Sequence, residues 1–161
     1  MDAELLKAFN KQLNQELQNA YLYLSMAAFF DEKSLSGFSH YFKIQAKEEL
    51  EHAMKFYEHI IDRGGEIELY DIPAPPKRWN SPLELMEEFY NAERRNTERI
   101  WELVDLAIKH NDKAAESFLK WFVDEQVEEE KNASELLAKI KLIGDNIAGL
   151  LQLDRVLAER K

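Results

Sequence analysis

Residues 45–54, Gln-Ala-Lys-Glu-Glu-Leu-Glu-His-Ala-Met, place glutamates and a histidine within about two turns of a predicted helix. Glu49 and His52 are three residues apart, so they share one helix face and can bind the same ion or neighbouring ions. The apolar residues Phe42 and Phe56 lie on the same face as Glu49. This stretch therefore predicts a helix that carries metal ligands on its core side.

The rest of the chain shows the same helical periodicity, with apolar residues three or four positions apart. In the first segment this row consists of Leu6, Phe9, Leu13, Leu17, Ala20, Leu24 and Ala27. The predicted long helices extend from Asp2 to Asp31, from the break at residues 33–37 to Gly64-Gly65, from Ser81 to His110-Asn111, and from Asp112 to Gly144, followed by a short amphipathic stretch from Ile147 to Arg160.

Local signals support three of these boundaries. Ser81 and Glu84 form a predicted capping box, with Pro82 at a position that needs no amide hydrogen. Asp112 is a predicted N-cap for the fourth helix. Gly144 is predicted to end that helix in a left-handed conformation.

The connection from Gly65 to Ser81 is long enough to run along the whole bundle. Its 17 residues reach about 56 Å when extended, whereas a helix of about 28 residues is roughly 42 Å long. The second and third helices are therefore predicted to be parallel, and the short links predict antiparallel neighbours. The expected fold is all-α: one domain over residues 1–161, a four-helix bundle with one long crossover and a short fifth helix.

Composition narrows the classes of function. The net charge of −10 argues against nucleic acid as a partner. The absence of cysteine excludes disulfides, thiolate zinc sites and iron–sulfur clusters. The N-terminus lacks a secretory leader, and the most apolar run, Ala20–Phe30, is about half of what a bilayer requires. We expect a cytoplasmic protein without a membrane partner.

Each of the other three long helices also has a glutamate in its apolar stripe: Glu16, Glu93 and Glu129. A buried carboxylate must be protonated, paired or bound to a metal, and too few lysines or arginines face inward to neutralise four of them. Oxygen-rich ligation with one imidazole suits iron or manganese better than structural zinc. A bridging carboxylate can hold two ions about 3.5–4 Å apart. Two ferrous ions placed in this way can together give two electrons to one O2 or peroxide, so the predicted reaction is oxidation of Fe(II) to Fe(III).

In these features the chain resembles the prokaryotic non-haem ferritins over nearly its whole length. The matching stretches are residues 12–17, 45–54, 91–93 and 118–130. The resemblance implies a ferritin-like four-helix bundle in which Glu16, Glu49 and His52 bind the first iron. Glu49, Glu93 and Glu129 would bind the second, so that Glu49 bridges the two ions.

The same resemblance implies further roles around the pair. Gln126 would be an amide ligand or hydrogen-bond partner, and Tyr23 would supply an electron or a hydrogen bond. A possible third iron would be bound by Glu48, Glu125, Glu128 and Glu129. Family members assemble as hollow shells of 24 subunits, with the fifth helix near the four-fold axes, and oxidise iron with O2 or peroxide before it mineralises inside.

Three departures separate the chain from related families. The second Glu-x-x-His of bacterioferritins is replaced here by residues 126–129, Gln-Val-Glu-Glu. The methionine that binds haem in bacterioferritins corresponds to Leu50, so no haem is expected. The cysteines of rubrerythrins are absent.

For some of these residues, a purely structural role is an alternative to metal binding. Glu48, Glu125 and Glu128 can instead form a solvated acidic face, and Gln126 can simply bond within its own bundle. Met26, Met54 and Met86 are interpreted as core residues, and His40, His59 and His110 as surface or packing residues. For the whole chain, the alternatives are a di-iron enzyme without storage and a non-catalytic helical scaffold or miniature DNA-protecting cage.

Overall fold

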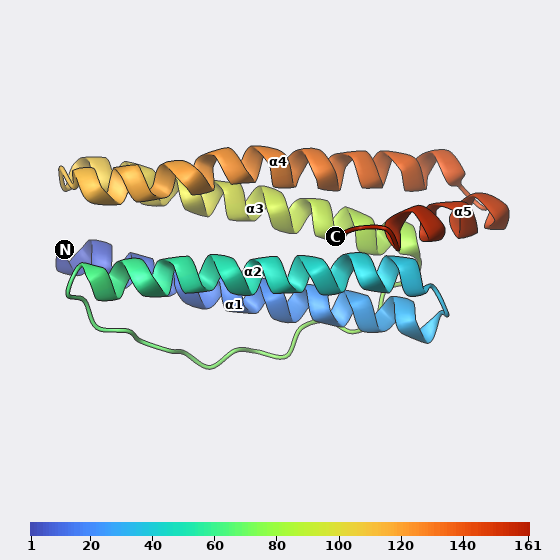
Figure 1. Cartoon of the computed structure of the whole chain (residues 1–161), viewed down its shortest axis with the longest axis horizontal. Coiled ribbons are helices and arrows are strands. Elements are labelled where there is room, and N and C mark those ends of the chain that lie inside the picture. The colour runs from blue at the N-terminus through green and yellow to red at the C-terminus, as the bar shows by residue number, and fades with distance from the viewer.

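A computed structural model describes all 161 residues and contains five helices and no strand. Their bounds are α1 Ala3–Glu32, α2 Ser36–Asp62, α3 Pro82–Lys109, α4 Lys113–Ile143 and α5 Ile147–Leu157. The four long helices lie side by side, and α5 folds back at the end of α4 (Figure 1). The predicted all-α bundle with a short fifth helix is therefore confirmed. No helix combines the length and apolar character needed to cross a membrane.

The residues predicted to cap or end helices lie at the helix ends in the structure, with one correction. Ser81 Oγ accepts a hydrogen bond of 3.1 Å from the amide of Glu84, and Asp112 Oδ1 accepts one of 3.0 Å from the fourth helix. Glu84, however, accepts from the amide of Asn80 rather than of Ser81, because its side chain reaches one residue beyond the N-cap. Gly144 ends α4 with a φ of +55°, which glycine adopts without a Cβ clash.

The crossover, residues 63–81, runs in extended form along the side of the bundle (Figure 1). Two asparagines of α1 hold its backbone. Asn10 donates to the Glu66 carbonyl at 2.9 Å and accepts from the Glu68 amide at 2.8 Å. Asn14 donates to the Glu68 carbonyl and accepts from the Tyr70 amide, both at 2.8 Å. Because the crossover spans the bundle, α2 and α3 are parallel, as predicted.

The bundle has two apolar clusters separated by a polar layer. One cluster contains Phe30, Phe42 and Phe89, near α5, and the other contains Phe9 and Phe56, at the opposite end. Buried polar residues of all four long helices lie between them along the chain, and this layer is the candidate site. The position of the layer at mid-helix lets apolar packing on both sides hold its geometry.

Two residues expected in the core are exposed, which corrects the sequence interpretation. Leu24 is 53% exposed and Met54 is 46% exposed. On α1 the buried stripe is centred on Glu16, Tyr23 and Phe30, and Leu24 lies about 100° around the helix from its neighbour Tyr23. The apolar row read from the sequence therefore coincides with the buried stripe at Phe9, Leu13 and Ala27 and leaves it at Leu24.

Helix α5 packs against the start of α2 at a point where only glycine fits. A Cβ built on Gly37 would lie 1.7 Å from the carbonyl oxygen of Asp154. The side chain of Asp154 also accepts a 2.9 Å hydrogen bond from the Phe38 amide. These contacts fix α5 on α2 and direct the residues after α5 along the α2 surface.

Candidate metal centre

Each long helix contributes one buried glutamate to the polar layer. Glu16 comes from α1, Glu49 from α2, Glu93 from α3 and Glu129 from α4, and His52 follows Glu49 by one turn of α2. All five side chains are at most 4% exposed. These side chains therefore point into the bundle, as the sequence predicts.

The five residues form two overlapping groups. Ligand atoms of Glu16, Glu49 and His52 all lie within 4.8 Å of one another, and so do those of Glu49, Glu93 and Glu129. Glu49 belongs to both groups. This arrangement suits two neighbouring cations with Glu49 between them, because hard divalent or trivalent ions bind carboxylate oxygens and imidazole nitrogen together.

Three atoms at the junction of the two groups lack any hydrogen-bond partner. They are both carboxylate oxygens of Glu49 and the Nδ1 atom of His52. His52 Nδ1 lies 3.4 Å from Glu49 Oε2 and 3.8 Å from Glu16 Oε2. Buried polar atoms are nearly always paired, so unpaired acceptors facing one another fit a bound cation.

Burial and mutual repulsion dominate the electrostatics of the layer. Burial, followed by the charge of Glu16, raises the pKa of Glu49 well above its ordinary value. Burial and the charge of Glu93 raise the pKa of Glu129 in the same way. Burial also raises the pKa of Glu93 to about 7. For Glu16, burial is outweighed by the contacts with Glu49 and His52, which lower its pKa to about 2.

A set of neutral amides, which the sequence interpretation missed, holds Glu16 in place. Gln12 donates to Glu16 Oε1 at 2.9 Å, and Asn96 donates to the same oxygen at 3.3 Å. Asn19 donates to Glu16 Oε2 at 3.4 Å. The available signal was spacing, since Gln12 and Asn19 lie four and three residues from Glu16 and so share its face.

Tyr23 and Gln126 both contact Glu93. The Tyr23 hydroxyl donates a hydrogen bond to Glu93 Oε1. Burial, together with the charges of Glu93 and Glu49, raises the pKa of Tyr23 well above its ordinary value, so the phenol stays a donor. Gln126 donates from Nε2 to the Glu93 carbonyl at 3.1 Å and to its carboxylate at 3.3 Å. Its amide oxygen accepts from Asn96 at 3.2 Å, so in this structure Gln126 is a hydrogen-bond partner.

The structure brings together only part of the expected third iron position. Ligand atoms of Glu125, Glu129 and His52 lie within 4.8 Å of one another. Glu48 instead pairs with Arg160 at 3.0 Å. Glu128 is exposed and belongs to no such group.

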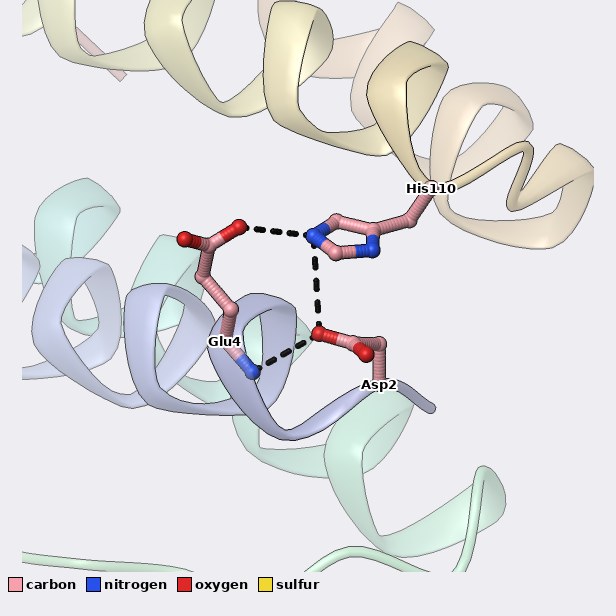
Figure 2. Close-up of side chains that lie close together, drawn as sticks. All are labelled: Asp2, Glu4 and His110. Carbon is pink, nitrogen blue, oxygen red and sulfur yellow. Dashed lines mark hydrogen bonds and ion pairs between the residues drawn. The ribbon is translucent and has the colours of Figure 1, made fainter.

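A second cluster of possible ligands lies where α1 begins and α3 ends (Figure 2). His110 Nε2 is 2.7 Å from Glu4 Oε1 and 3.4 Å from Asp2 Oδ1. Asp2 is also the N-cap of α1, accepting from the Glu4 amide at 2.8 Å, and Lys109 lies 3.3 Å from Glu4. Because each carboxylate already has a partner at the surface, we interpret this cluster as a polar contact between helix ends. This agrees with the expected surface role of His110.

A bundle with one crossover and a buried carboxylate–histidine layer defines the ferritin-like class of proteins. The sequence model described as a ferritin-like domain matches residues 6–143. The chain therefore belongs to the ferritin family.

Named relatives cover almost the whole chain. The bacterial non-heme ferritin of Staphylococcus saprophyticus is 42% identical over 160 residues, which cover 99% of this chain and 96% of the relative. That of Bacteroides fragilis strain 638R is 40% identical over 157 residues, 98% of each chain. The open pore ferritin from the hyperthermophilic archaeon Archaeoglobus fulgidus superposes with a TM-score of 0.99 at 44% identity, covering 100% of this chain and 99% of that one.

Proposed function

We propose that the protein is an iron-storage ferritin subunit that oxidises Fe(II) to Fe(III) at a di-iron centre. The observation that carries the proposal is Glu49, which lies in both ligand groups and has no hydrogen-bond partner on either carboxylate oxygen. Glu16 and His52 complete the first iron position, and Glu93 and Glu129 complete the second. Membership of the ferritin family supports iron as the bound metal.

Iron is the substrate of this reaction. Two Fe(II) ions lose one electron each, and O2 accepts both electrons and two protons to give hydrogen peroxide. Peroxide can itself accept two electrons and two protons, which gives water. Placing both ions against one carboxylate pairs the two one-electron donors, so that a two-electron acceptor is reduced at one site.

The chain's own residues supply positioning and proton control. Since burial raises the pKa of Glu49, Glu93 and Glu129, these groups hold protons before iron arrives. Iron binding requires the carboxylates and so releases those protons. The hydrogen bonds from Tyr23 and Gln126 orient Glu93 toward the second iron position.

Storage needs an enclosed space, and we propose a hollow shell of 24 subunits that retains the ferric product. The naming of the relatives as ferritins supports this assembly. Exposed apolar side chains at and before α5, namely Leu142, Ile147 and Leu151, are suited to contacts between subunits. Native mass should correspond to a 24-mer that retains many more than two iron ions per subunit. A monomer or dimer holding only two would favour a di-iron enzyme without storage.

Anaerobic Fe(II) loading followed by air tests the oxidation step. Wild-type protein should give a fast rise in Fe(III) absorbance, and the variant Glu49→Ala with His52→Ala should lose it. Glu102→Ala, which removes an exposed carboxylate of α3, is the control and should keep the wild-type rate. An unchanged rate in the double variant would reject the assignment.

A further inference from the structure

Arg160, which follows α5, returns to α2 and is fixed there by several contacts. Its guanidinium donates from Nη1 to the Tyr41 carbonyl at 2.9 Å. The same group lies over the Tyr41 ring, 4.1 Å from its centroid. The backbone carbonyl of Arg160 lies 2.6 Å from His40 Nε2. Backbone, ring and guanidinium contacts together make this a defined position for a long side chain.

The second guanidinium nitrogen connects Arg160 to the metal centre. Nη2 donates to Gln45 Oε1 at 2.9 Å and to Glu48 Oε2 at 3.0 Å. Gln45 in turn donates from Nε2 to Glu129 Oε2 at 2.6 Å. Because the amide oxygen of Gln45 accepts from Arg160, its NH2 group is directed at Glu129. Arg160 therefore lies one residue away from a candidate iron ligand.

The pairing with Glu48 has a consequence for cation binding. Glu48 belongs to the acidic set expected to bind a third iron, yet its carboxylate already has a fixed positive partner. An incoming cation must displace that guanidinium or bind close to it, and both are unfavourable because like charges repel. The exposed fractions of the two side chains are 19% for Arg160 and 36% for Glu48, so solvent screens this repulsion only in part.

We propose that Arg160 is a built-in counter-cation at the third iron position, which keeps cation binding at that position weak. The proposal rests on the proposed di-iron function, because it assigns regulation of the same site. Arg160 acts on Glu48 directly and on Glu129 only through Gln45, so its role is positioning and competition. The two primary iron positions do not contact it directly, so the change should be largest at the third position.

Calorimetric titration of the metal-free protein with Zn(II), a redox-inert probe, tests this proposal without relying on oxidation. Wild type should bind two Zn(II) per subunit tightly and a further Zn(II) weakly. In Arg160→Gln the affinity for the weakly bound Zn(II) should rise about tenfold, as expected for loss of one nearby, partly screened charge. Adding Glu48→Gln to that variant should abolish the gain.

Arg155→Gln is the matched control, since it removes an exposed arginine of α5 with no hydrogen bond or ion pair. If Arg160→Gln fails to fold, Arg160→Met keeps an unbranched aliphatic side chain at this position and removes the guanidinium. The proposal would be overturned if the weakly bound Zn(II) had the same affinity in the Arg160 variant and in the Arg155 variant. Absence of two tight Zn(II) in wild type would instead count against the di-iron function, while the comparison at the weakly bound Zn(II) would still decide the role of Arg160.

Discussion

His52 Nδ1 lies 3.4 Å from Oε2 of Glu49 in the middle of the bundle, and neither atom has a hydrogen-bond partner. A helix turn places the two side chains together, and the packing of α1, α3 and α4 removes them from water. In the empty protein this arrangement disfavours the charged carboxylate, because burial removes its hydration and no donor replaces it, so Glu49 retains a proton.

The metal-free protein should lose stability as pH rises from about 4.5 to about 7. Glu93 has a folded-state pKa of about 7 against an ordinary value of 4.5. The folded state therefore holds a proton that the unfolded chain releases, so its contribution is complete below 4.5 and is lost as pH passes 7. The raised pKa values of Glu49 and Glu129 act in the same direction.

Urea denaturation of chelator-treated protein at pH 5 and pH 7.5 measures this effect. Glu93 alone should account for about 2 kcal/mol of the difference, and Glu93→Gln should reduce it. Glu16 has the opposite sign and matters only in acid, because its lowered pKa of about 2 stabilises the fold above 4.5. Equal stability at the two pH values would show that the layer carries no such protons.

Asn96→Ala should destabilise the metal-free bundle by about 2 kcal/mol. Asn96 donates to Glu16 and to Gln126 and accepts from Gln12, so its loss removes hydrogen bonds from buried side chains of α1 and α4. Thermal or urea denaturation measures the change. Asn91→Ala, at an exposed position of the same helix, is the control. Equal loss in both variants would mean that the amide network contributes nothing specific.

Tyr23→Phe should slow Fe(III) formation about fivefold, the effect of losing one hydrogen bond of about 1 kcal/mol. Fe(II) binding should keep its stoichiometry, because the hydroxyl contacts Glu93 and all ligand groups persist. Stopped-flow absorbance and anaerobic titration measure rate and binding separately. Tyr21→Phe, two residues away and exposed, should match wild type. A Tyr23 variant with the wild-type rate would remove Tyr23 from the reaction.

Asn14→Ala should expose the crossover to protease without unfolding the bundle. Asn14 holds the backbone of Glu68 and Tyr70 through two hydrogen bonds of 2.8 Å, and the crossover has few other anchors in helices. Limited proteolysis should cut between residues 66 and 76 several times faster than in wild type. Asn132→Ala on α4 serves as the comparison. Cleavage at the wild-type rate would show that Asn10 alone is sufficient to hold this segment.

The inward glutamates could be predicted from the sequence because a helix repeats every 3.6 residues. Once Phe42 and Phe56 define a core face on α2, the position of Glu49 on that face follows. The crossover was predictable from length alone. Sequence reasoning placed Leu24 and Met54 wrongly. Leu24 lies at the flank of the α1 stripe, because periodicity gives the direction of a stripe but not its width. Met54 lies about 140° around α2 from Glu49 and so points away from the core.

The contacts between helices were not predictable in this way. The hydrogen bond from Gln12 to Asn96 joins residues 84 positions apart and depends on the rotation and register of α1 against α3. The contact of Arg160 with Glu48 depends further on how α5 folds back, which is fixed by the close approach of Asp154 to Gly37. Neither contact can be predicted from the local periodicity of the sequence.

Anomalous diffraction from crystals soaked anaerobically in Fe(II) tests the central claim most directly. We predict two iron peaks per subunit about 3.5–4 Å apart, the usual spacing of two-metal sites, with the Glu49 carboxylate between them. His52 should contact one peak and Glu129 the other. A polar layer that takes up no iron, or a single ion remote from Glu49, would contradict the account.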